Sequence, residues 1–258
     1  MTAFDWQSAP AGDVNHQYSP SRWATKPIAE HLADYARLSA PWVGEQLLRP
    51  GQPLLVYIHG GYWQALSARD SLFMAPDASG LGVSVHAVDY LLAPAASVEQ
   101  IVEECITDIE RILSVARAPR VVLAGSSAGG HLATMCTRSP RLHGRIDLAV
   151  MLSGVFDLRP LVRTPTNDAL GLTSTRAASL SPQLLGVDTF AASAMVAVGQ
   201  HESPEFVRQS ADFAAHLSSH GVPTTSVVVP GRDHFDLPYD VLRAGTVVGD
   251  HVLAHLLG

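Results

Sequence analysis

The chain has 258 residues, 47% of them hydrophobic, and a formal net charge of −7 at pH 7. These values suit one large domain with a sizeable core, and no basic run is present that could follow a nucleic-acid backbone or an anionic membrane. Because no stretch stays apolar for the length of a bilayer and the N-terminus shows no targeting pattern, we expect a single domain over 1–258 that is soluble and cytoplasmic.

Short apolar runs of strand length recur along the chain. Their hydrophobicity is continuous rather than alternating, which is what strands covered on both faces require. The predicted strands are 53–59 (PLLVYIH), 82–90 (GVSVHAVDY), 120–126 (RVVLAGS), 147–153 (DLAVMLS), 193–199 (SAMVAVG) and 224–231 (TTSVVVPG). The pattern predicts an α/β fold with a mostly parallel central sheet and helices on both faces.

Two of the helices between these strands are clearly marked. Over 97–117, Ser97 and Gln100 form a capping-box pattern, and apolar residues then recur at four-residue spacing. A second helix is predicted to begin after Ser203, with Pro204 at its first position, and to end near Gly221. Strand and helix therefore alternate, as crossover connections in a parallel sheet require.

Two segments are less regular, and two cysteines stand alone. The N-terminal segment (1–50) and the stretch 155–190 are rich in loop-forming residues, and the second is expected to form a cap or loop over the carboxyl edge of the sheet. Cys105 and Cys136 lie in helical patterns without metal-ligand spacing, so they are expected to be small buried hydrophobic residues. Neither a disulfide nor a metal site is predicted.

The strand at 120–126 runs directly into GSSAGG and a helical pattern. Read as G-x-S-x-G, this stretch places Gly125 and Gly129 around Ser127, not around its neighbour Ser126. A serine at such a strand-to-helix elbow is pushed out at the top of the sheet, so we expect Ser127 to be the nucleophile. The alternative is a tight glycine-rich turn that only packs or holds an anion.

A serine hydroxyl needs a base, and the base needs a group that fixes its tautomer. After a strand–elbow–helix nucleophile, the chain order is acid and then histidine. His234 fits as the base because it follows the last predicted strand and so emerges at the same edge as Ser127. Other histidines fit the order less well, namely His201, His216 and His220.

The acid is expected in the loop after the strand 193–199. Glu202 is the first carboxylate there, whereas Glu205 lies in the first turn of the next helix, where an acidic side chain commonly serves the helix dipole. We therefore predict Glu202 as the acid. Asp233 is expected to point away from His234, and Asp236 to shape the same loop.

A tetrahedral intermediate needs N–H donors aimed at its oxyanion. One is expected from Ala128, directly after the nucleophile, and the other from the loop HGGYW after the first strand. Glycines at 60 and 61 allow the backbone to approach closely and to adopt positive φ, so Gly61 with Gly60 or Tyr62 is predicted to complete the oxyanion hole. His59 is expected to hydrogen-bond the loop backbone.

Two interpretations of Tyr62 and Trp63 stay open. They could form an aromatic wall that binds the substrate beside the acyl or leaving group, or they could be ordinary core aromatics at the end of a strand. The sequence pattern fits both.

Together, HGG, DYLLAP (89–94), GSSAG and a late DHF resemble the hormone-sensitive-lipase-like branch of the α/β-hydrolases. HGGYW in place of HGGG resembles the kynurenine formamidase (arylformamidase) group in particular. Further agreement with that group covers nearly the whole chain: QYSPSRW (17–23), SGVFDLRPL (153–161), HESPEFVRQS (201–210) and DHFDLPYD (233–240).

The resemblance implies an α/β-hydrolase fold and hydrolysis of N-formylkynurenine to kynurenine and formate, without a metal or organic cofactor. It places the family's triad on Ser127, Glu202 and His234, although the family's acid is usually an aspartate. A carboxylesterase of small acyl esters with the same triad is the alternative. A binding module without activity is disfavoured, because it would not need a nucleophile, acid, base and oxyanion glycines together.

Overall fold

A computed structural model of the chain describes residues 4–258; residues 1–3, the start of the N-terminal segment, lie outside the described residues. A single six-stranded sheet has the order β2-β1-β3-β4-β5-β6, and every neighbouring pair is parallel. The strands are β1 (Leu54–Ile58), β2 (Ser84–Val88), β3 (Val121–Ser126), β4 (Leu148–Leu152), β5 (Ser193–His201) and β6 (Thr224–Asp233). All of the predicted strands are therefore present, with ends shifted by a few residues.

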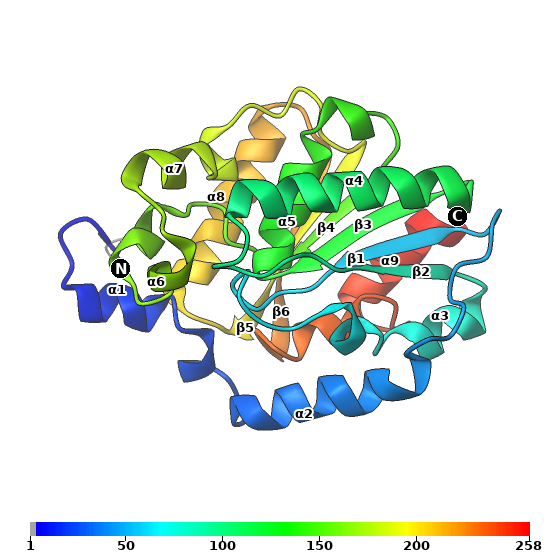
Figure 1. Cartoon of the computed structure of the whole chain (residues 1–258), viewed down its shortest axis with the longest axis horizontal. Coiled ribbons are helices and arrows are strands. Elements are labelled where there is room, and N and C mark those ends of the chain that lie inside the picture. Colours follow the sequence, from blue (N-terminus) through cyan, green and yellow to red (C-terminus); the bar gives the residue numbers. More distant parts are fainter. Residues whose placement is uncertain (1–3) are drawn as a thin grey trace.

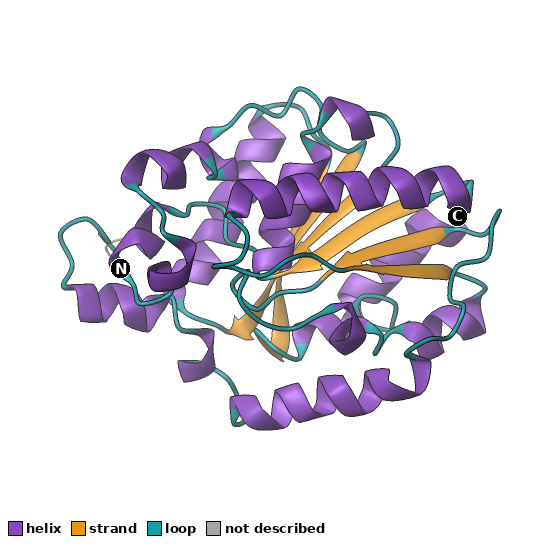
Figure 2. Cartoon of the chain, viewed as in Figure 1, coloured by secondary structure: helices purple, strands orange, loops and turns teal. Residues whose placement is uncertain are grey.

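Helices cover both faces of this sheet (Figures 1 and 2). Alternate residues of β1 enter one of two cores: Leu54 and Val56 pack with the helices at 98–116, 128–137 and 204–219, while Leu55 and Tyr57 pack with the helices at 75–81 and 247–257. The helices are α1 (Ala11–Gln17), α2 (Ile28–Ser39), α3 (Ala75–Leu81), α4 (Val98–Ala116), α5 (Ala128–Thr137), α6 (Asn167–Leu170), α7 (Ser174–Ser179), α8 (Pro204–Ser219) and α9 (Val247–Leu257). The predicted fold class is confirmed.

The two helices that the sequence marked begin where their capping residues predicted. At α4, the Ser97 hydroxyl accepts a hydrogen bond from the Gln100 N–H, and the Gln100 side chain accepts one from the Ser97 N–H. At α8, the Ser203 hydroxyl accepts from the Phe206 N–H at 3.2 Å. These bonds satisfy N–H groups that a helix start leaves free.

The carboxyl ends of the parallel strands meet at one edge of the sheet, and this edge gathers the motifs. HGGYW follows β1 and the serine elbow follows β3, and β1 and β3 are neighbours. β5 and β6 are also neighbours, with His201 of β5 paired to Asp233 of β6. The residues that come next, Glu202 and His234, are therefore brought together by strand register.

None of the described helices combines the length and the apolar character needed to cross a bilayer.

Candidate active site

Ser127 lies at a sharp turn between β3 and α5. Its φ is 55° and its ψ is −121°, a conformation that a side chain normally avoids. Glycine is required on both sides: a Cβ on Gly125 would lie 2.1 Å from the Gly129 oxygen, and a Cβ on Gly129 would lie 2.0 Å from the Ile58 oxygen. The turn is fixed further by the Ser127 N–H, which donates to the Leu152 oxygen at 2.8 Å.

Glu202 and His234 are hydrogen-bonded to each other in the structure. His234 Nδ1 lies 2.7 Å from Glu202 Oε2, and each residue is only 6% exposed. Because a carboxylate only accepts hydrogen bonds, Nδ1 must carry the proton. Nε2 is then the nitrogen free to take a proton from a group in the cavity, which Ser127 and His234 both line.

The second oxygen of Glu202 is held by two donors. The Ser153 hydroxyl donates to Glu202 Oε1 at 2.5 Å, and the Gly199 N–H donates to the same oxygen at 2.7 Å. Ser153 follows β4 directly and is 1% exposed, with a positive φ of 51°. Sequence reasoning missed it, although the position of Ser153 at the carboxyl end of a strand is the signal that located the other residues.

Ser153→Ala is expected to lower kcat about tenfold with little change in KM, because a hydrogen bond to a charged group contributes roughly 1.5–3 kcal/mol and here it orients the carboxylate. Steady-state kinetics would measure kcat and KM separately. Ser153→Gly, which relieves the positive φ, should lose the same activity, and Ser193→Ala at the far end of β5 is the matched control. Full kcat in both Ser153 variants would show that the hydroxyl does not position Glu202.

The loop after β1 lies directly against the elbow. A Cβ on Gly60 would be 3.0 Å from the Ser126 oxygen and 3.1 Å from Ser127 Cβ, and Gly61 has a φ of 95°. Glycine is therefore needed at 60 for close approach and at 61 for conformation. Among the described residues, the N–H groups of Gly60, Gly61, Tyr62 and Ala128 donate no hydrogen bond. All four predicted donors therefore remain free for an oxyanion.

Contacts from His59 and Tyr90 hold this loop. His59 Nδ1 lies 2.9 Å from the Gly60 oxygen, and the Tyr90 hydroxyl donates to the His59 oxygen at 3.0 Å and to the Gly60 oxygen at 3.2 Å. The rings of His59 and Tyr90 are stacked with centroids 4.2 Å apart. His59 thus hydrogen-bonds the loop backbone, as predicted from the sequence.

The two aromatics of HGGYW have different surroundings. Tyr62 lines the cavity, and its hydroxyl donates to the backbone carbonyl oxygen of Tyr18 at 2.7 Å. Burial, followed by the charge of Glu202, raises the pKa of Tyr62 well above its usual value, so its hydroxyl stays protonated. Trp63 is 0% exposed, packs edge-on against His131 and does not line the cavity. The predicted substrate contact is therefore not retained for Trp63, whose place is that of a core aromatic.

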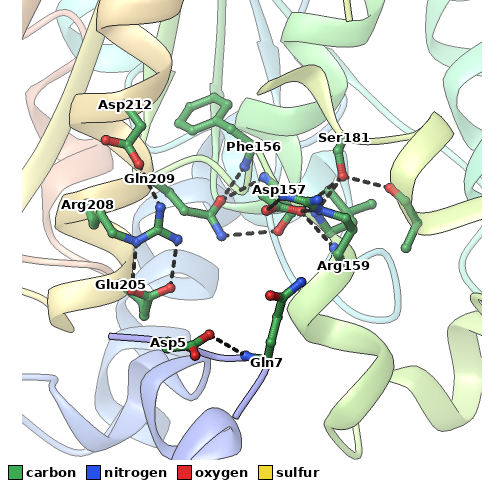
Figure 3. A network of polar contacts seen from close by, with 12 residues as sticks. Asp5, Gln7, Phe156, Asp157, Arg159, Ser181, Glu205, Arg208, Gln209 and Asp212 are labelled. Carbon is green, nitrogen blue, oxygen red and sulfur yellow. Dashed lines mark hydrogen bonds and ion pairs between the residues drawn. The ribbon is translucent and has the colours of Figure 1, made fainter. Parts of the chain in front are cut away.

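Glu205, the competing acid, is engaged elsewhere (Figure 3). Its carboxylate receives two hydrogen bonds from Arg208, each 2.8 Å long, and one from the Tyr18 hydroxyl at 2.9 Å. Gln209, one turn further along α8, donates to the same Tyr18 hydroxyl at 2.7 Å. This network joins the N-terminal segment to α8 and does not include His234.

The loop of His234 is anchored to the N-terminal segment through Asp233. Asp233 Oδ2 accepts hydrogen bonds from the N–H and hydroxyl of Thr25 at 2.7 and 2.6 Å, and it lies 3.3 Å from His31 Nε2. Burial would raise the pKa of Asp233, but hydrogen bonds from Thr25 and from the loop outweigh it and lower the pKa to about 2. Asp236 Oδ1 accepts from the Asp233 N–H at 2.7 Å and so closes the loop.

Ser127, His234 and the HGG loop line a cavity of about 360 Å³. Its floor includes Ser126, Ser127 and His234, and its walls are largely apolar or aromatic. The N-terminal segment supplies much of the cover, from Tyr18 to Tyr35, whereas the stretch 155–190 contributes Thr166. The N-terminal segment is therefore a larger part of the cover than the sequence suggested.

Comparisons with known proteins agree with this fold. A family model described as the α/β-hydrolase fold matches residues 55–236. The chain is 30% identical to the kynurenine formamidase of Danio rerio, over 90% of this chain and 92% of that protein. It is 31% identical to the kynurenine formamidase of Salmo salar, over 98% and 97%. The solved structure of EstE1, a thermostable carboxylesterase cloned from a metagenomic library, has a TM-score of 0.73 at 14% identity, covering 98% of this chain and 99% of that one.

The fold, the site and the family match define a hydrolase. The chain belongs to the α/β-hydrolase fold family and is a relative of the kynurenine formamidases. The resemblance seen in the sequence is confirmed.

Proposed function

We propose that this hydrolase cleaves an aryl formamide, with N-formylkynurenine as its substrate and kynurenine and formate as products. The observation that carries the proposal is the assembled site, in which Ser127, the bonded pair of Glu202 and His234, and the HGG loop meet at one cavity. Similarity to kynurenine formamidases over 90% and 98% of the chain supports the choice of substrate. The proposed partner is thus a small molecule, without a metal or organic cofactor.

In the proposed first half-reaction, the Ser127 hydroxyl attacks the formyl carbon while His234 Nε2 takes the proton. Negative charge develops on the formyl oxygen and is stabilised by the N–H groups of Ala128 and Gly61. Glu202 stabilises the imidazolium without accepting its proton. His234 then donates the proton to the departing nitrogen, the C–N bond breaks, and the aryl amine leaves a formyl ester on Ser127.

Water completes the reaction. His234, again neutral, removes a proton from a water molecule that attacks the formyl ester, and a second oxyanion forms between the same two donors. When this intermediate collapses, His234 returns the proton to the Ser127 oxygen and formate leaves. Each step uses the same hydrogen bond between Glu202 and His234.

A carboxylesterase of small acyl esters is the second candidate, because the same groups would carry ester hydrolysis without change. The two functions differ in the acyl and leaving groups. A phenolate leaves more readily than an amine, so activated phenyl esters are expected to react in either case. Ester hydrolysis alone therefore cannot separate them.

The ratio of kcat/KM for the N-formyl and N-acetyl forms of one aryl amine separates the two functions. We expect a preference for formyl of roughly 100-fold, because the HGG loop lies so close to Ser127 that an added methyl group would clash or displace the carbonyl from its donors. The rate at which the free amine is released would measure the hydrolysis of both forms. Equal efficiencies, or a preference for acetyl, would favour the carboxylesterase.

A further inference from the structure

The charges around the cavity are unbalanced. Among the described residues that line the cavity, Asp70 is the one carboxylate, and none is a lysine or arginine. Glu202, bonded to His234 behind the cavity wall, adds a second negative charge near the floor. A ligand inside this cavity therefore meets negative charge that no lysine or arginine of its lining offsets.

Asp70 has one carboxylate oxygen to spare. It lies in the 3₁₀-helix Ala68–Ser71, where Oδ2 accepts a hydrogen bond from the Ser67 hydroxyl at 2.8 Å. No hydrogen bond or ion pair to Oδ1 occurs within residues 4–258. Ser67, the residue before this short helix, thus holds one oxygen of the carboxylate, and the same bond leaves Oδ1 for a ligand.

The basic residues next to Asp70 in the sequence and within the cover lie outside the cavity lining, Arg22 among them as an exposed residue. Arg69, next to Asp70, is exposed and lines a different surface depression. Lys26, in the cover, is paired with Asp34 at 2.5 Å and does not line the cavity. Neither residue neutralises Asp70 from the cavity side.

We propose that Asp70 is a specificity residue that binds an ammonium group at the end of the substrate away from the reacting formamide. The inference rests on the proposed function and deepens it. N-formylkynurenine carries both an ammonium and a carboxylate group at that end. The cavity matches the first with Asp70 and offers the second no cation, so an aryl formamide with an ammonium group and without a carboxylate should be the better substrate.

The test uses three 2-formamidophenyl ketones that differ only at the far end: one with an ammonium group, N-formylkynurenine with both groups, and one with a carboxylate. Wild type is expected to show kcat/KM falling in that order. In Asp70→Asn, the ratio of kcat/KM for the ammonium compound to kcat/KM for the carboxylate compound should fall about tenfold. A partly exposed charge changes kcat/KM a few-fold, and it acts on these two compounds in opposite directions. Asp70→Glu should keep the preference.

Asp168→Asn is the matched control, because it removes the same charge from an exposed residue that does not line the cavity. Its ratio should equal that of wild type. A wild-type preference for the carboxylate compound would overturn the inference, and so would an Asp70→Asn enzyme that keeps the wild-type ratio.

A binding arm separates this inference from the proposed function. The three free aryl amines are titrated by calorimetry into Ser127→Ala protein with and without Asp70→Asn, so that no turnover is needed. If the ammonium compound binds more tightly than the others and Asp70→Asn abolishes this preference, the inference is supported, even if no formamide is hydrolysed. A lack of hydrolysis would then count against the proposed reaction alone. Indifference to charge would reject the role of Asp70 while leaving the reaction standing.

Discussion

Ser127→Ala is expected to lower kcat by about 10⁴-fold or more while the protein folds normally, because only the attacking oxygen is removed and the elbow backbone is left in place. The strained turn does not depend on the hydroxyl: the Ser127 N–H still reaches the Leu152 oxygen, and the glycines at 125 and 129 still permit the close packing. Residual activity would come from the oxyanion donors and from substrate binding. The measurement is kcat beside a thermal unfolding curve.

Ser126→Ala is the matched control for that variant. Ser126 also lines the cavity, and its hydroxyl accepts a hydrogen bond from Tyr57 at 3.1 Å. Loss of this bond should change kcat only a few-fold, and a serine-directed organophosphate should still label Ser127. If Ser126→Ala abolished activity and Ser127→Ala preserved it, the register of the motif would be wrong.

Glu202→Gln is expected to lower kcat by about 10³- to 10⁴-fold, because a carboxamide cannot accept on both sides. If its NH₂ group faces His234, Nδ1 must accept and Nε2 carries the proton, so the base for Ser127 is lost. If the NH₂ group faces the other way, it meets the donors Ser153 and Gly199. Either orientation removes one interaction that the carboxylate satisfies.

Glu205→Gln is the control for Glu202→Gln. Glu205 is 0% exposed and bonded to Arg208 and Tyr18, so its replacement should lower the melting temperature and leave kcat within a few-fold. Kinetics and thermal unfolding of both variants would separate the two roles. The reverse pattern, with a severe loss of kcat in Glu205→Gln alone, would transfer the acid role to Glu205.

The sequence predicted the strands and the elbow well because their physical requirements are local. A strand buried on both faces must be apolar along its length, and the G-x-S-x-G turn excludes any Cβ at 125 and 129. Glu202 and His234 could be placed because chain order and the shared edge of a parallel sheet restrict where such groups emerge. Their hydrogen bond follows from the register of β5 and β6.

Other features depend on contacts distant in the sequence, and the pattern could not reveal them. Ser153 follows the end of a strand, which makes it a candidate for the site, but its partner Glu202 is known only once β4 is seen beside β5. Trp63 could not be told from Tyr62, because the direction of each ring depends on the loop's positive φ values. Asp70 becomes significant only once the cavity shows that no basic residue shares its lining.

The central claim is that this hydrolase acts on an aryl formamide at Ser127. The most direct test compares the release of kynurenine from N-formylkynurenine with the hydrolysis of short phenyl esters, both measured with the same purified protein over a range of pH. The account predicts efficient release of kynurenine by wild type and its loss in Ser127→Ala. Ready hydrolysis of the phenyl esters with no release of kynurenine at any pH would contradict the account and make the protein a carboxylesterase.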